Sequence, residues 1–238
     1  MAKEQRSAPA RRASDQGRLG RLNRQRVLAM ALALVDREGL SALSMRRLGA
    51  ELGVEAMALY RYAAGKDALL DGLVEALYLE IEERLEAGRE GGADPDVPDW
   101  RAGLHRIARA TYDVCMDHPQ AVPLLATRML AVPMAQRPMA VLRDHERMLV
   151  LLGEAGLDEV RASAAFRACT AWILGYVAVE LRPMVDNPDE PDPAFRLGLH
   201  RMPAQELPRL RETATALAER GGPEGLTSGL DALLDRFA

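Results

Sequence analysis

Apolar residues recur along this chain at intervals of three and four positions, the spacing that places them on one side of an α-helix. The first such segment runs from about residue 23 to residue 38, with Asn23 as a helix N-cap and Gly39 as the stop signal. Its apolar face consists of Val27, Leu28, Ala31, Leu34 and Val35. No stretch alternates for long with the period of two that is typical of a strand, so we expect an all-α fold.

A long amphipathic helix is predicted from Asp67, as its N-cap, to about Gly88, and a loop rich in Gly, Asp and Pro follows it. Later helices are each bounded by Pro, Gly or a capping Asp. We expect them at about 100–117, 119–127, 134–155, 158–182, 205–220 and 223–237. Residues 183–204 contain five prolines and no sustained period, which predicts a long mobile loop.

Residues 44–66 predict two short helices separated by a tight turn. Ser44 is suited to cap the first of them, and Gly53 has the backbone freedom that the turn needs. The second displays Tyr60, Arg61 and Tyr62 before it ends near Lys66. This is the layout of a helix-turn-helix, whose second helix enters the major groove of DNA.

Three parts of the chain therefore follow from the pattern. We expect a disordered basic arm at 1–20, a three-helix helix-turn-helix DNA-binding domain at 21–66, and a larger α-helical ligand-binding and dimerisation domain at 67–238. The arm either reaches into a minor groove or serves only as a solubilising tail, and composition favours neither.

Charge divides the chain at the same place. Residues 1–66 carry 13 Lys and Arg against 6 Asp and Glu, whereas the whole chain has a net charge of −4. A basic head binds phosphates by releasing counterions, and an acidic body is repelled from the same duplex. The split favours docking of the head on DNA, although chance clustering in a highly charged surface would also produce it.

Other composition features bound the setting of the protein. Cys115 and Cys169 are far apart and have no zinc spacing, so we expect small buried thiols in a reducing cytoplasm. The charged N-terminus does not resemble a secretory signal, and the longest uncharged run, Ala168–Val179, is too short to span a bilayer. We therefore expect a cytoplasmic protein without a membrane partner.

The run from Leu52 to Leu70 resembles the head of TetR-type repressors. It combines a Gly-Val step at residues 53–54, then Leu-Tyr-Arg-Tyr at 59–62 and Lys-Asp-Ala-Leu-Leu at 66–70. The body resembles, more loosely, that of the tetracycline-repressor branch, through His118-Pro119 and the closing Gly229–Leu234 segment. The resemblance implies a homodimer, a palindromic DNA operator and a small-molecule effector site in the body.

The same resemblance assigns the DNA-binding residues. Arg46, Ala56, Met57 and Ala58 hold positions that face bases, and Ser44, Tyr60, Tyr62 and Lys66 hold positions that contact the phosphate backbone. Alanine and methionine cannot form bidentate hydrogen bonds with bases, which leaves Arg46 and Arg61 for guanine. The alternative interpretations are a partly buried core tyrosine at position 60 and a solvated terminal charge at position 66.

An effector cavity should be mostly apolar with a few converging polar groups, and eleven methionines favour an adaptable one. The candidate ligand-binding residues are His105, Met116, His118, Arg128, Met129, Met134, His145, Met148, Trp172, Tyr176 and Glu180. Each has ordinary core packing or exposure as its alternative. The branch holds a magnesium-drug chelate with a histidine where Leu124 or Leu125 stands here, so we expect neither a metal nor another cofactor.

Two helices of the body suggest a dimer seam. On the helix expected at 158–182, small residues recur at Ala164, Ala168, Ala171, Gly175 and Ala178. The helix expected at 223–237 carries an apolar stripe of Leu226, Leu230, Leu233, Leu234 and Phe237. The stripes suit a four-helix seam with a two-fold copy, or else the core of one protomer.

Two other function classes compete with a ligand-responsive repressor. A hydrolase or transferase has little support, because the chain has no nucleophile elbow, phosphate loop or metal-ligand spacing. A DNA-binding regulator whose body contacts only proteins stays open as an alternative.

Overall fold

The computed structural model describes residues 22–88, 99–182 and 189–237, with the backbone alone at 129–131. These residues form helices and turns and contain no strand, as expected for an all-α fold. The predicted basic arm lies outside them. The helices, in chain order, are α1 Arg24–Glu38, η1 Leu40–Ala42, α2 Met45–Leu52, α3 Ala56–Leu59, α4 Lys66–Ala87, α5 Asp99–Asp117, α6 Val122–Ala131, η3 Met134–Gln136, α7 Met139–Glu154, α8 Glu159–Glu180, α9 Pro193–Arg196, η4 Leu199–Arg201, α10 Pro208–Ala218 and α11 Gly222–Leu234.

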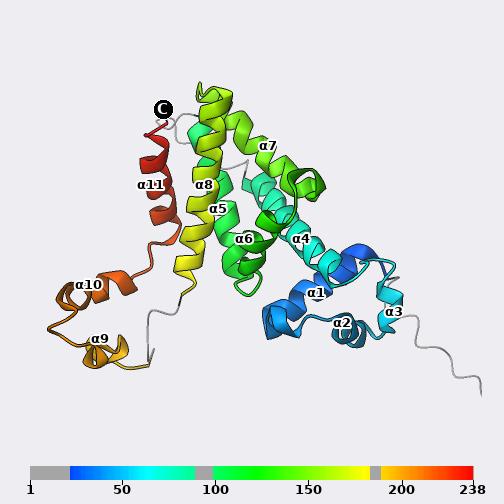
Figure 1. Ribbon diagram of the computed structural model, residues 1–238, viewed down its shortest axis with the longest axis horizontal. Helices are drawn as coiled ribbons and strands as arrows, with labels where there is room; N and C mark the ends of the chain where they lie inside the picture. Colours follow the sequence, from blue (N-terminus) through cyan, green and yellow to red (C-terminus); the bar gives the residue numbers. More distant parts are fainter. Residues whose placement is uncertain (1–21, 89–98, 183–188, 238) are drawn as a thin grey trace, which may run out of the picture.

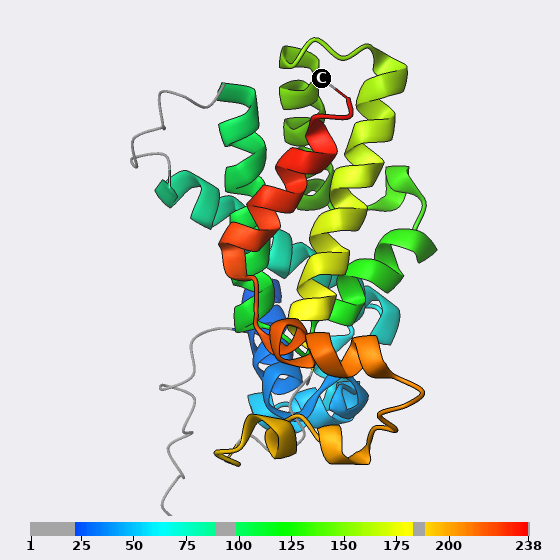
Figure 2. The ribbon, with the colours of Figure 1, turned by 90° about the vertical axis from the view of Figure 1, so that its left-hand side faces the viewer.

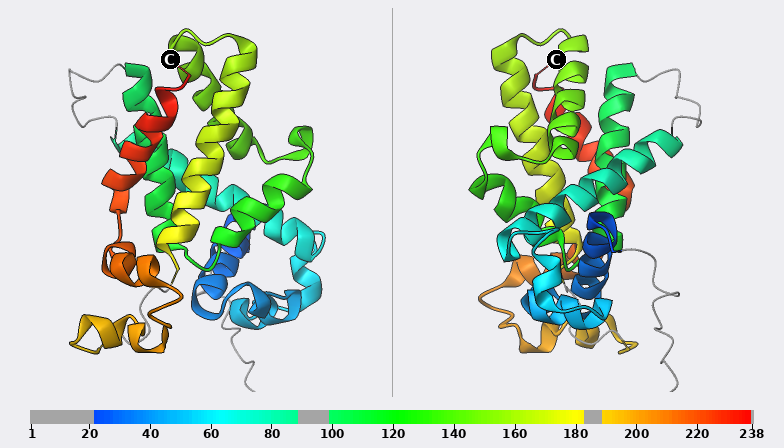
Figure 3. Two further views of the ribbon diagram at one scale, coloured as in Figure 1. Left: turned by 60° about the vertical axis from the view of Figure 1, so that its left-hand side comes forward. Right: turned by 90° about the vertical axis from the view of Figure 1, so that its right-hand side faces the viewer.

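A small head and a larger body make up the molecule (Figure 1). The head consists of α1, α2 and α3, and α4 runs from it into the body (Figure 3, right). In the body, α4 packs against α5 and α7, and α8 packs against α7 and α11. The core extends through both parts, because Leu34 and Leu48 of the head and Leu73 and Leu104 beyond it are all fully buried.

Several helix ends are set by the local signals that the sequence carries. The Asn23 side chain accepts a hydrogen bond from the backbone of Arg26 at 2.8 Å, and Gly39 follows the last turn of α1 with a positive φ. The predicted N-cap at Asp67 is wrong, since α4 already begins at Lys66 and Asp67 lies in its first turn. A carboxylate there still interacts favourably with the helix dipole.

Prolines shift two of the predicted boundaries. The helix expected from 134 to 155 is broken into η3 and α7, because Pro138 has no N–H to donate and holds Arg137 in an extended conformation. The helix expected at 119–127 begins only at Val122, after a turn in which Ala121 donates to the His118 carbonyl at 2.9 Å.

The expectation of one long loop at 183–204 is wrong for its described part, which holds the short helices α9 and η4. Asp192 caps α9 by accepting from the backbone of Ala194 at 2.8 Å, with Pro193 at the first helical position. Figures 1 and 2 show α9 and α10 extending away from the helical body. Four large exposed apolar side chains lie on the described part of this extension: Phe195, Leu207, Leu210 and Leu217.

Candidate DNA-binding face and body cavity

The helix-turn-helix is built as the sequence predicts. Ser44 Oγ accepts a hydrogen bond from the Arg47 backbone at 3.1 Å and so caps α2. Gly53 ends α2 with φ 66° and ψ 31°, a left-handed conformation that side chains with a Cβ disfavour. Leu48, Leu52 and Leu59 are buried beneath the turn, and their packing fixes α3 relative to α2.

The outer side of α3 is open. Met57 is 73% exposed and Tyr60 is 47% exposed, and Arg61 and Lys66 are exposed as well. Tyr60 is therefore a surface residue and not a core tyrosine. Ala56 and Ala58 are half-buried beside them. This leaves a short rod of side chains free to enter a groove.

Adjacent arginines of α2 differ in their partners. Arg47 Nη2 lies 2.6 Å from Glu38 Oε1 and 2.8 Å from Glu51 Oε1, and the Arg47 hydrogen bond holds the pKa of Glu38 below its usual range. Arg46 is exposed and has no ion-pair partner within the described residues. Arg47 holds α2 to α1, whereas the guanidinium of Arg46 is available to a ligand.

Tyr62 is half-buried and faces the other way from Tyr60. Its hydroxyl donates to the Leu22 carbonyl at 2.7 Å, and the Arg61 guanidinium lies 5.4 Å from its ring centroid. The hydroxyl thus ties the segment that precedes α1 to the turn that follows α3. Its oxygen can still accept a hydrogen bond, but its proton is already used.

His118 joins the head to the body. Its Nδ1 lies 2.8 Å from Asp36 Oδ2 of α1, and its Nε2 lies 2.9 Å from Glu80 Oε2 of α4. Burial lowers the pKa of this histidine, but the hydrogen bonds and charges of the two carboxylates outweigh it and raise the pKa above the usual value. An imidazolium that donates to both acids fits this geometry.

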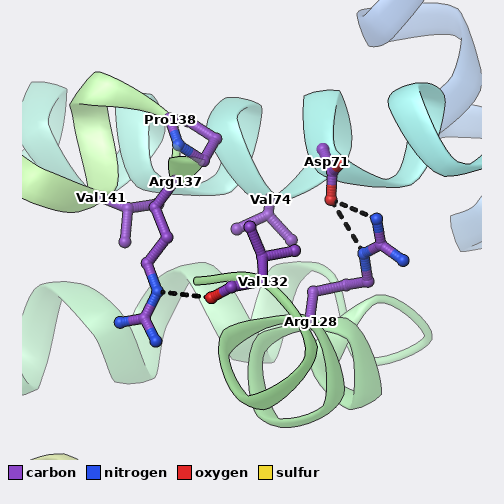
Figure 4. A pocket seen from close by; sticks show the side chains of 7 residues that line it. All are labelled: Asp71, Val74, Arg128, Val132, Arg137, Pro138 and Val141. Carbon is purple, nitrogen blue, oxygen red and sulfur yellow. Dashed lines mark hydrogen bonds and ion pairs between the residues drawn. The ribbon is translucent and has the colours of Figure 1, made fainter. Parts of the chain in front are cut away.

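A second link joins α6 to the start of α4 (Figure 4). Arg128 donates to Asp71 Oδ1 from Nε at 2.8 Å and from Nη2 at 2.5 Å, and Nη1 lies 3.3 Å from Asp67 Oδ1. Arg128 lines a small cleft there together with Asp71, Val74, Val132, Arg137, Pro138 and Val141. Its guanidinium is occupied by α4, so a movement of α6 would be passed to the helix that leaves the head.

A separate cavity lies in the body between α4, α5, α7 and α8. It is lined by Tyr78, Ile107, Thr111, Asp144, His145, Met148, Thr170, Ile173 and Leu174. Two of the eleven ligand-binding candidates, His145 and Met148, are among them. Burial is the main cause that lowers the pKa of His145 to about 4 and raises the pKa of Asp144 to about 6.

The other ligand-binding candidates lie elsewhere. His105 Nε2 lies 2.8 Å from Asp231 Oδ1, where Arg101 also pairs with α11. Met116 is half-buried against the core, Met134 is exposed, and the side chain of Met129 lies outside the described residues. Glu180 accepts hydrogen bonds from the backbones of Gly221 and Gly222.

Trp172 and Tyr176 pack against the glycine-rich side of α11. Trp172 Nε1 donates to the Leu226 carbonyl at 3.0 Å, and the Tyr176 hydroxyl donates to the Gly222 carbonyl at 2.9 Å. A Cβ at Gly229 would lie 2.1 Å from Trp172 Cζ2, so only glycine allows this approach. These two rings hold α8 and α11 together within one protomer.

The two stripes predicted for a dimer seam differ in their surroundings. Leu226, Leu230 and Leu234 of α11 are fully buried against their own protomer, so the interpretation of these leucines as seam residues is wrong. On α8, by contrast, Ala171 and Gly175 are exposed. Figure 3, left, shows α8 and α11 side by side along one face of the body.

Helix α8 is long and apolar enough, by length and composition, to cross a bilayer, and 28% of that window is buried. This is weak evidence for a membrane span, because a helix that packs against another protein subunit has the same composition.

Leu124 and Leu125, which the sequence analysis compared with a metal-binding histidine, are buried in the core. No group of potential metal ligands occurs in the described parts of the chain.

Sequence reasoning missed Asp144 and Thr170 as cavity residues. Asp144 lies in a run of charged residues on α7 and Thr170 is a single hydroxyl on an apolar stretch of α8, and neither pattern is a signal, because such residues usually face solvent or bond to their own helix. Only the packing of α7 against α8 brings them to one place.

Comparison with known proteins connects these features to a family. Residues 27–73 match the family model for bacterial regulatory proteins of the tetR family, and residues 93–235 match that for the tetracyclin repressor-like C-terminal domain. The HTH-type transcriptional repressor DrrR1 of Streptomyces coeruleorubidus is 32% identical over 67% of this chain. That match spans 54% of the relative, little more than half of its length.

Solved structures give the same result for the fold. A possible TetR family transcriptional regulator from Streptomyces coelicolor A3(2) is 28% identical, with a TM-score of 0.68 over 90% of this chain and 98% of that one. The Streptomyces coelicolor protein ActR, solved in complex with actinorhodin, is 21% identical with a TM-score of 0.68 over 92% and 96%. The chain belongs to the tetR family of DNA-binding bacterial transcriptional regulators, with a head and a body that both match the family.

Proposed function

We propose that this chain is a cytoplasmic, homodimeric transcriptional repressor that binds a palindromic operator and is released by a small, mostly hydrophobic effector. The observation that carries the proposal is the open face of α3 on a rigid, capped head. Met57 and Tyr60 project from this face, and Arg46 lies beside it without an ion pair to any residue that the structure describes. Such a rod suits a major groove.

Contacts to DNA divide into two kinds in this proposal. Arg46, with Arg61 as a second candidate, reads guanine, and the methyl groups of Ala56, Met57 and Ala58 contact thymine. Ser44, Tyr60, Tyr62 and Lys66 position the head on the phosphates. Tyr62 can contact a phosphate only when its hydroxyl leaves the Leu22 carbonyl, because a phosphodiester accepts hydrogen bonds and donates none.

The dimer follows from the exposed side of α8. A palindromic site needs two heads related by a two-fold axis. The small side chains of α8 allow a second helix to approach closely, and Val160 and Val179 at its two ends are 79% and 56% exposed.

Release of DNA would pass through the links between body and head. A ligand that prefers one arrangement of the body shifts the population of DNA-competent dimers by the difference of its affinities for the two arrangements. Arg128 connects α6 to α4, and His118 connects α5 to both α1 and α4. A change in the distances between the body helices would therefore move the heads.

The arginine pair of α2 tests the DNA-binding face. The duplex is first selected from a random library with the unmodified protein. We expect Arg46→Ala to weaken binding of this duplex about tenfold or more in fluorescence anisotropy, the effect of losing one base contact. Arg47→Ala removes the same charge from the neighbouring position and should weaken binding much less, while lowering the melting temperature. Equal losses for the two variants, or none for Arg46→Ala, would contradict the assignment.

The dimer has its own test. Gly175→Glu places a charge on the exposed small-residue side of α8 and should yield a monomer in analytical ultracentrifugation that no longer binds the selected duplex. Ser163→Glu, which is also exposed on α8 but lies off this stripe, is the control. A dimer that persists in Gly175→Glu would place the seam elsewhere.

A further inference from the structure

Within the described part of the body, four buried polar atoms have no hydrogen-bond partner. They are Asp144 Oδ1, His145 Nδ1, His145 Nε2 and Thr170 Oγ1. All belong to residues that line the same cavity between α4, α5, α7 and α8. Folded proteins contain few such atoms, and each one destabilises the fold when it is left unsatisfied. Their concentration around one cavity indicates a partner that the protein chain itself does not supply.

The charge state of these groups restricts that partner. His145 is 6% exposed, and burial together with the nearby charge of Arg137 keeps the ring neutral at pH 7. A neutral imidazole offers one N–H donor and one acceptor nitrogen. Asp144, with its pKa raised to about 6, is largely ionised at pH 7 and offers an acceptor oxygen. The Thr170 hydroxyl can donate or accept.

The rest of the cavity wall is mostly apolar. Ile107, Met148, Ile173 and Leu174 line it, and the Thr111 hydroxyl already donates to the Ile107 carbonyl at 2.8 Å. A hydrocarbon would fill this space but leave the four polar atoms unsatisfied. An anion would be repelled by Asp144 and by Glu82, which also acts on Asp144, whereas a cation would face the charges of Arg137 and Arg147.

We propose that this cavity binds an uncharged ligand with an apolar, ring-sized body and at least two hydroxyl groups. One hydroxyl donates to Asp144 Oδ1, and another donates to the bare nitrogen of His145 and accepts from Thr170. The imidazole N–H donates to a ligand oxygen. This inference rests on the proposed function, because it names the chemical class of the effector.

Binding must widen the cavity, which is small in this conformation. The unbranched side chain of Met148 can change rotamer readily, whereas Tyr78 belongs to α4 and can move only with that helix or by turning its ring. A ligand that presses on Tyr78 therefore acts on the helix whose first turn adjoins the head. Binding of the hydroxylated ligand in the cavity can therefore shift the DNA-binding face through α4.

Three probes of similar size separate the ligand classes in thermal-shift and calorimetric titrations of the full chain. Resorcinol has two hydroxyls, toluene has none, and benzoate is an anion. We expect resorcinol at millimolar concentrations to raise the melting temperature, toluene to raise it less, and benzoate to leave it unchanged. Toluene or benzoate stabilising as strongly as resorcinol, or no effect of resorcinol, would overturn the proposal.

Two threonines of the same cavity provide matched variants. Thr170→Val removes an unsatisfied hydroxyl and should weaken resorcinol binding about fivefold to tenfold, the effect of one lost hydrogen bond. Thr111→Val has the same change in shape, but its hydroxyl is already satisfied, so resorcinol affinity should change less than about twofold. Equal effects of the two variants would overturn hydroxyl recognition at Thr170.

Affinity of each variant for the selected duplex is measured in parallel without probe. DNA binding that persists while every probe fails would contradict this inference and leave the DNA-binding assignment intact. A Thr170→Val protein that is less stable without ligand than the unmodified chain would show that resident water satisfies the hydroxyl, and would overturn the proposal.

Discussion

The junction around His118 and the cavity around His145 use the same side chain in opposite ways. At the junction, both ring nitrogens face carboxylates at 2.8 and 2.9 Å, and the pKa of His118 is raised. In the cavity neither nitrogen of His145 has a partner, and its pKa is lowered to about 4. Surroundings decide the role: a charged histidine holds two parts of the molecule together, and a neutral one remains available to a ligand.

The largest expected difference between the two sites appears on acidification. The folded pKa of His145 lies about 2.5 below the ordinary 6.5, so the protein must lose stability as pH falls from 6.5 to about 4, by roughly 3 kcal/mol for this group. His145→Phe should lose less over the same range. Urea unfolding of both proteins between pH 7 and pH 4 measures the difference.

Asp144 titrates in the same range with the opposite sign, because its raised pKa makes protonation stabilising in the folded protein. The comparison is therefore repeated in an Asp144→Asn background. In each background, the free energy of unfolding is compared between the protein with His145 and the His145→Phe variant. If the two depend on pH in the same way in both backgrounds, His145 is not held neutral.

At the junction, His118→Leu should lower the free energy of unfolding by about 1–2 kcal/mol at pH 6, since two carboxylates lose their partner and solvent screens part of the effect. The raised pKa makes this contribution complete below pH 6.5, and it disappears as pH rises through the folded pKa. The difference in free energy of unfolding between the unmodified protein and His118→Leu must therefore decrease as pH rises. The contribution of a neutral His145 has the opposite trend, because it is lost as pH falls. His200→Leu, at an exposed histidine, is the control.

The smallest effect sharpens the contrast between satisfied and unsatisfied groups. Without ligand, Thr170→Val should raise the free energy of unfolding by about 1 kcal/mol, because it removes a buried hydroxyl without a partner. Thr111→Val should lower it by about 0.5 kcal/mol, because its hydroxyl donates to Ile107. Chemical denaturation of the two valine variants measures both changes in the free energy of unfolding. If the two changes have the same sign, the distinction between the satisfied and the unsatisfied hydroxyl is wrong.

The head was predictable at the level of single residues because its signals are local. Asn23 and Ser44 each cap a helix through the backbone three residues later, and Gly53 ends α2 within its own turn. At Asp67 the predicted N-cap was wrong. The Asp67 carboxylate instead lies 3.3 Å from the guanidinium of Arg128, a contact between residues 61 positions apart that a local capping signal cannot predict.

The body was predictable as helices but not as a site. His105, His118 and Arg128 were ligand-binding candidates as polar groups that could converge on an apolar cavity. In the folded chain each lies against a carboxylate from another helix, whereas His145, the remaining histidine candidate, has none among the described residues. Asp144 and Thr170 gave no comparable signal, since having no partner depends on what the rest of the chain brings near.

Sequence alone determined the helical architecture, the capped helix-turn-helix and the opposite charges of head and body, because these depend on spacing within a few turns and on composition. Tertiary structure alone decided which polar residues are paired, which side of α8 stays open and where the unsatisfied cavity lies. The physical reason is range: a cap or a turn is completed within about four residues, whereas the partners of His118 lie 82 and 38 positions away in sequence and meet it only when the helices pack.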